Sequence, residues 1–149
     1  MRLPLVERLI RESLTWALVD GLAADVAGGV RAADPTVEPT LDRWASDPDF
    51  WVRRSSLLVE LRAHRAGAPL EPFFRRADLM LDEKEFFIRK AIGWVLREVG
   101  KRRPSEVAAW LAPRADRASG VTMREAVRHL PPDDAERLMA AHRERRAAT

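Results

Sequence analysis

The sequence contains no cysteine. This absence excludes a disulfide framework, a thiolate metal site and a thiol nucleophile, and it favours a reducing, cytoplasmic location. The N-terminal residues lack the basic flank, apolar core and small-residue cleavage site of a signal peptide, and no apolar run reaches membrane-spanning length. We therefore expect neither export nor membrane insertion.

Histidine and lysine are scarce. The three histidines, His64, His129 and His142, are not spaced as metal ligands, so we expect no metal site and no cofactor. Arginine supplies nearly all of the 26 basic residues. This bias has two interpretations: a GC-rich bacterial genome that encodes arginine in excess, or a use of the planar guanidinium to bind phosphate.

The rest of the composition is typical of a soluble helical domain. Of the 149 residues, 46% are hydrophobic and 33% are charged, with both signs interspersed and a formal net charge of +3. Such a composition favours amphipathic helices over disorder. The length is sufficient for one buried core, so we expect a single domain over residues 1–149.

Apolar residues recur at helical spacing, and no segment is convincing as a strand. Leu3, Val6, Ile10 and Leu14 form one such helical face. We expect helices over residues 3–14, 16–30, 41–45, 50–64, 86–99, 123–130 and 134–145. The predicted fold class is therefore all-α.

Some helix ends carry recognisable signals. Gly28 and Gly29 are expected to end the second helix, because glycine is common just after a helix C-terminus. Capping boxes are expected at two helix starts, formed by Asp82 with Glu85 and by Thr122 with Glu125.

Self-comparison shows a repeat. Residues 50–55 recur as 86–91 at an offset of 36, and residues 88–92 recur as 123–127 at an offset of 35. A constant period of this size, with two helices in each period, is typical of stacked helix pairs. An apolar residue followed by two basic residues is HEAT-like, whereas the tetratricopeptide pattern is absent. We predict an α-solenoid, or superhelix, of HEAT-like helical repeats.

Four polar residues, Asp20, Arg54, Lys90 and Glu125, occupy equivalent positions of successive repeats. Equivalent positions of stacked helices form a column, so Arg54 and Lys90 are expected to line a basic track that follows a phosphate backbone. Further members of this track are Arg53, Arg89, Arg97 and the run 101–103. The alternative is that each basic residue lies on an ordinary solvated helix face.

Asp20 is unusual in this column, because a carboxylate opposes the binding of a polyanion. Trp16 lies four residues earlier on the same helical face, and Trp94 is expected to open onto the same groove from another repeat. Two indoles and a carboxylate could hold a sugar and a cationic base. The alternatives are core packing for either tryptophan and a solvated surface role for the aspartate.

Four segments resemble the AlkD-type DNA alkylation repair glycosylases: residues 14–20, 50–56, 85–98 and 123–126. The run 85–98 is the longest and most specific of them. The resemblance covers essentially the whole chain but only the C-terminal part of the family's usual domain. We therefore expect a short form that lacks the N-terminal repeats.

The resemblance implies hydrolysis of the N-glycosidic bond of cationic N3- or N7-alkylated purines in double-stranded DNA, without base flipping. It implies that Asp20 is the catalytic carboxylate and that Trp16 and Trp94 flank the deoxyribose. Arg54 and Lys90 would hold backbone phosphates near the lesion. We accordingly expect a nucleoid-associated bacterial protein.

Two other functions remain open at this point. One is a non-catalytic module that binds DNA through the same groove, and the other is a protein-interaction scaffold, a common role of HEAT arrays. In a short form, the outer surface of the helix over 3–14 would also lack a covering repeat. This surface suggests a homodimer through the N-terminal helix.

Overall fold

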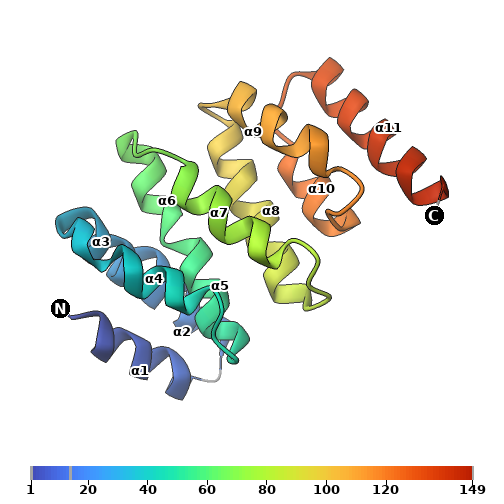
Figure 1. Cartoon of the computed structure of the whole chain (residues 1–149). Coiled ribbons are helices and arrows are strands. Elements are labelled where there is room, and N and C mark those ends of the chain that lie inside the picture. The colour runs from blue at the N-terminus through green and yellow to red at the C-terminus, as the bar shows by residue number, and fades with distance from the viewer. Residues whose placement is uncertain (1, 14, 149) are drawn as a thin grey trace. The chain divides into compact units, whose positions relative to one another are not determined.

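The computed structural model describes residues 2–13 and 15–148, and these residues form helices and connecting turns without any strand (Figure 1). The predicted all-α repeat fold is confirmed. None of the helices among these residues is long and apolar enough to cross a lipid bilayer. The chain divides into two compact units, Met1–Met80 and Leu81–Thr149, each described here by itself.

The described residues of the first unit form seven α-helices. They are α1 (Leu3–Ser13), α2 (Trp16–Gly21), α3 (Gly28–Ala33), α4 (Glu38–Trp44), α5 (Phe50–Leu58), α6 (Glu60–Ala63) and α7 (Glu71–Met80). A π-helical segment (Leu22–Ala27) joins α2 to α3 without a break, and 3₁₀ turns occupy Pro35–Val37 and His64–Ala66.

The core of the first unit is built on the apolar face of α1. Leu3, Val6 and Ile10 are buried there, as their helical spacing predicts, whereas Leu14 lies outside the described residues. The other helices contribute the remaining members of this cluster: Val19, Ala27, Leu41, Trp44, Val52 and Val59. Each buried aliphatic side chain stabilises the fold by about 1.5–3 kcal/mol relative to exposure.

Charged side chains hold α1 to α4. The Glu7 carboxylate accepts hydrogen bonds from Arg43 Nη2 and Trp44 Nε1, both at 2.9 Å. Arg11 adds a bond to Glu7 at 2.8 Å and one to Asp47 at 3.0 Å. The Arg43 hydrogen bond is the main cause that lowers the pKa of Glu7 from 4.5 to about 2.

The prediction that Gly28 and Gly29 end a helix is wrong. The helical path that begins at Trp16 continues through both glycines to Ala33, and Asp34 is the first extended residue. A Cβ on Gly28 would lie 3.3 Å from the carbonyl oxygen of Val59 and 3.4 Å from Arg62 Cβ. These glycines therefore allow α3 to pack closely on its neighbour, rather than marking a C-terminus.

Four α-helices lie in the described part of the second unit. They are α8 (Phe86–Gly100), α9 (Pro104–Leu111), α10 (Gly120–Ala126) and α11 (Pro132–Ala148), with a 3₁₀ turn at Ala112–Arg114. Both predicted capping boxes are wrong. Glu85 itself caps α8 by accepting from Phe87 N, and Ser119 caps α10 by accepting from Thr122 N. The Thr122 hydroxyl instead donates to the Arg89 carbonyl at 3.0 Å, which links α10 to α8.

Helices α8 and α10 lie side by side in intimate contact (Figure 1). Gly93 makes this approach possible, because a Cβ on it would lie 2.7 Å from Glu125 Cβ and 3.2 Å from the Thr122 carbonyl oxygen. Neither atom is the far end of a flexible side chain. A side chain at position 93 would therefore push the two helices apart.

We expect Gly93→Ala to lower the free energy of unfolding by about 1–3 kcal/mol, because the steric overlap outweighs the better helix propensity of alanine. The matched control is Gly21→Ala, where a Cβ meets none of the described atoms within 4 Å. That control should be neutral or stabilising by up to about 1 kcal/mol. Urea unfolding followed by circular dichroism measures both, and equal effects would contradict the role assigned to Gly93.

We expect Glu7→Gln to reduce the loss of unfolding free energy that the native protein shows as the pH falls below neutral. Because folding lowers the pKa of Glu7 from 4.5 to about 2, its ion pairs stabilise the fold above pH 4.5, and this stabilisation is lost as the pH falls toward 2. The contribution should be about 1–3 kcal/mol at neutral pH. Unfolding free energies of native protein and variant, measured from neutral to acidic pH, should converge as the pH falls.

Glu12→Gln on the same helix is the control for this titration. Glu12 pairs with Arg8 at an exposed position, where an ion pair contributes little. A gap between native protein and Glu7→Gln that did not depend on pH would contradict the electrostatic explanation.

Candidate functional site

Asp20 and Arg54 form a bidentate ion pair within the first unit. Arg54 Nε donates to Asp20 Oδ1 at 2.8 Å and Arg54 Nη2 donates to Oδ2 at 3.0 Å. The side chain of Arg54 is 5% exposed and that of Asp20 is 15% exposed. The pair joins α2 to α5 and fixes the plane of the carboxylate, because a guanidinium fork matches both of its oxygens.

Trp16 lies one helical turn before Asp20 and is 59% exposed. A large aromatic ring at this level of exposure does not contribute to the core and is available for contact with a ligand. Leu18 on the same short helix is equally exposed, whereas Val19 is buried. Trp16 is therefore not a core residue, and the core-packing alternative for it is wrong.

The π-helical segment Leu22–Ala27 begins two residues after Asp20. A π-helical turn is wider than an α-helical turn, so it changes which faces the residues before and after it present. Trp16 and Asp20 both precede this segment and share one face of α2, whereas Ala23 and Ala27 within the segment are buried in the core. Such segments are rare and are frequent at functional sites.

In the second unit, Lys90 and Arg97 contact the same carboxylate. Lys90 Nζ donates to Glu125 Oε1 at 2.7 Å, and Arg97 Nη1 donates to Oε2 at 2.9 Å. Trp94 lies between them on α8 and is half-buried. This unit therefore presents two cations and an indole together, with a carboxylate from α10 holding the cations.

The remaining members of the expected basic track also contact acceptors. Arg53 donates to the carbonyl oxygens of Asp47 and Pro48, at 2.7 and 3.0 Å. Arg89 donates to the Glu83 carbonyl at 2.8 Å. Phosphate binding by Arg53, Arg54, Lys90 or Arg97 stays a prediction, and Arg54 is the least accessible of the four.

A family model described as DNA alkylation repair enzyme matches residues 1–130 of the chain. The chain belongs to the DNA alkylation repair enzyme family. The resemblance inferred from the four segments is thereby confirmed.

One solved structure similar to this chain is described as a predicted DNA alkylation repair enzyme from Enterococcus faecalis. The two are 25% identical in sequence, with a TM-score of 0.76. The match covers 89% of this chain and 62% of that chain, so this chain spans less than two thirds of its relative's length. No curated protein matches.

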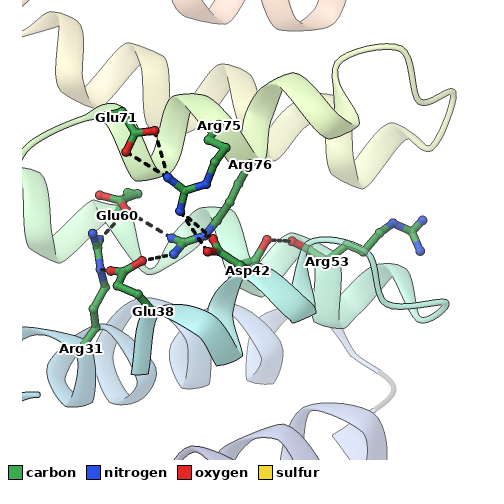
Figure 2. A network of polar contacts seen from close by, with 9 residues as sticks. Arg31, Glu38, Asp42, Arg53, Glu60, Glu71, Arg75 and Arg76 are labelled. Carbon is green, nitrogen blue, oxygen red and sulfur yellow. Dashed lines mark hydrogen bonds and ion pairs between the residues drawn. The ribbon is translucent and has the colours of Figure 1, made fainter. Parts of the chain in front are cut away.

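Besides the Asp20–Arg54 pair, the first unit contains a network of charged side chains that the sequence analysis did not predict (Figure 2). Glu60 on α6 is fully buried and accepts hydrogen bonds from Arg31 and, at 3.5 Å, from Arg76. The same two arginines also bind Glu38, and Arg76 Nε donates to Asp42 at 3.0 Å. This network joins four helices of the unit, α3, α4, α6 and α7.

The charges of this network depend on one another. Burial raises the pKa of Glu60, and the two arginines act in the opposite direction. Burial opposes the charge of Arg31, but its bonds to Glu60 and Glu38 outweigh this effect and raise its pKa. Every buried charge has an oppositely charged partner, so we assign the network to the fold rather than to a reaction. The described residues hold no group of three or more histidine, cysteine, aspartate or glutamate side chains that could bind a metal.

We expect Arg54→Ala to lower the free energy of unfolding by about 2–4 kcal/mol, because it leaves Asp20 without its partner and opens a gap beside α2. Lys90→Ala should cost less than about 1 kcal/mol, because Lys90 is 43% exposed and Arg97 still pairs with Glu125. Urea unfolding at neutral pH measures both. If Arg54→Ala lowered the free energy of unfolding no more than Lys90→Ala does, the stabilising role assigned to the Asp20–Arg54 pair would be wrong.

Proposed function

We propose that this chain is a DNA glycosylase that hydrolyses the N-glycosidic bond of cationic N3- or N7-alkylated purines in duplex DNA while the base stays stacked. Membership of the DNA alkylation repair enzyme family supports a DNA repair role. The observation that supports the glycosylase activity is the position of the Asp20 carboxylate. It accepts two hydrogen bonds from Arg54 and lies one helical turn from the exposed ring of Trp16.

The chemistry of the lesion fits such a site. When the bond between C1′ and the base nitrogen breaks, its electron pair neutralises the positive charge of the alkylated base, and positive charge develops on the sugar. A fixed carboxylate stabilises that oxocarbenium-like sugar. Water then adds hydroxide to C1′ and releases a proton to Asp20 or to solvent. Bases without a positive charge are poor leaving groups and should be poor substrates.

Arg54 orients the carboxylate in this proposal. An ionised carboxylate has about four lone-pair sites, and the bidentate pair uses two of them, so each oxygen can still accept a bond from water or face a cationic sugar. Trp16 supplies a π face for the deoxyribose, as a cation–π contact in the transition state. In the second unit, Trp94 is proposed as a contact to deoxyribose, and Lys90 and Arg97 as contacts to backbone phosphates.

A second function is a non-catalytic module that binds DNA. The observation that favours it is that both oxygens of Asp20 accept hydrogen bonds from Arg54. Binding of duplex DNA without base release would support this alternative.

A homodimer through the N-terminal helix stays a prediction, as does a cytoplasmic, nucleoid-associated location. The exposed residues of α1 include Arg8, Arg11 and Glu12, together with Leu5. Most of these side chains are charged, so the exposed surface of α1 offers little apolar area for a dimer contact.

The glycosylase proposal predicts release of 7-methylguanine from methylated duplex DNA at low salt. Asp20→Asn should reduce the rate by at least about 100-fold, because it removes the charge that faces the sugar. The matched control is Asp25→Asn, an exposed position on the same helical path with the same change in charge. Thermal unfolding of each variant confirms that the protein assayed is folded. No release by the native protein, or equal release by native protein and Asp20→Asn, would overturn the proposal.

A further inference from the structure

One face of α8 in the second unit carries a tryptophan with one basic residue on each side of it. Lys90, Trp94 and Arg97 are spaced four and three residues apart, so their side chains share this face. Trp94 is half-buried and so presents part of its ring. Positive charge beside an accessible indole is the combination that binds a nucleic-acid strand.

A single carboxylate from α10 holds both cations. Lys90 and Arg97 each donate to a different oxygen of Glu125. The close approach at Gly93 brings Glu125 onto α8, and the Glu125 side chain is only 12% exposed. The hydrogen bond from Lys90 is the main cause that holds the pKa of Glu125 below its usual value, so Glu125 is charged at neutral pH.

We propose that Glu125 attenuates DNA binding by this face, acting as an internal counterion that a backbone phosphate must displace from Lys90 and Arg97. This inference rests on the proposed DNA-binding function. Lys90, Arg97 and Glu125 together carry a net charge of +1, and Glu98, 3.7 Å from Arg97 Nε, opposes the charge of Arg97 further. The face therefore binds DNA more weakly than two unopposed cations would.

The contacts of the two cations make this exchange feasible. The Lys90 side chain is 43% exposed, so a phosphate oxygen can approach its ammonium group and take the place of the Glu125 carboxylate. Arg97 is 24% exposed and donates to Glu125 through Nη1, whereas its Nε is buried and lies 3.7 Å from Glu98 Oε1. A guanidinium has five N–H donors, so a phosphate would bind Arg97 through its terminal nitrogens. A phosphate offers the same oxyanion chemistry as Glu125, so it can replace the carboxylate without a change of fold.

The test is the affinity of the whole chain for a fluorescein-labelled undamaged duplex, measured by anisotropy over about 50–300 mM salt. Glu125→Gln should bind about 3–10-fold more tightly at the lowest salt. The plot of log Kd against log salt should become steeper by about one, because one more phosphate contact forms. Adding Lys90→Gln and Arg97→Gln to Glu125→Gln should remove the gain.

Glu136→Gln is the matched control, since it makes the same change in net charge at an exposed position of α11. It should leave the salt slope unchanged. Equal or weaker binding by folded Glu125→Gln overturns this inference alone when the native protein still binds DNA. If neither protein binds the duplex at the lowest salt, the inference and the DNA-binding proposal both fall.

Discussion

A carboxylate and a cation from equivalent positions of neighbouring repeats face one another in each unit of this protein. Asp20 pairs with Arg54 in the first unit, and Glu125 pairs with Lys90 in the second. Each pair joins the helices that carry it, and other pairs at similar sequence separations do the same, such as Glu7 with Arg43 and Asp42 with Arg76. The helical period therefore fixes which charges meet, and the charges fix how neighbouring repeats dock.

The same pairs restrict what the surface can do. The column of two carboxylates and two cations is neutralised pair by pair, so a phosphate would compete with a carboxylate for each cation. The solvent exposure of the basic residue in each pair then indicates whether that residue stabilises the fold or can bind a ligand. Arg54 is nearly buried and orients Asp20, whereas Lys90 is partly exposed and can reach a phosphate. The exposed ring of Trp16 beside Asp20 is what distinguishes the first pair from an ordinary inter-repeat contact.

The periodic features of the fold could be predicted from the sequence, and the packing details could not. The 3.6-residue pattern located α1, α5 and α8, and the repeat offsets identified equivalent positions. Helices α7 and α9 were missed, although Pro72 and Pro104 stand in their first turns, where proline is typical. Gly28 was misinterpreted because glycine ends a helix in the left-handed conformation, and of the described glycines only Gly67 has a positive φ.

For the candidate site, the sequence identified the residues but not their partners. Spacing placed Trp16 and Asp20 on one face, which the structure retains. It gave no sign that Arg54 would be buried against Asp20, because burial depends on how α2 and α5 pack. The network around Glu60 was missed for the same reason, although Asp42 and Arg76 are one repeat period apart.

The central claim is that the Asp20 carboxylate stabilises positive charge on a deoxyribose. It is tested most directly by comparing the affinity of the chain for two duplexes, one with a cationic iminosugar in place of a nucleotide and one with its neutral abasic counterpart. We expect the cationic duplex to bind at least about tenfold more tightly, as a mimic of the transition state, and Asp20→Asn to abolish this preference. Equal affinities of the native protein for the two duplexes would contradict the claim.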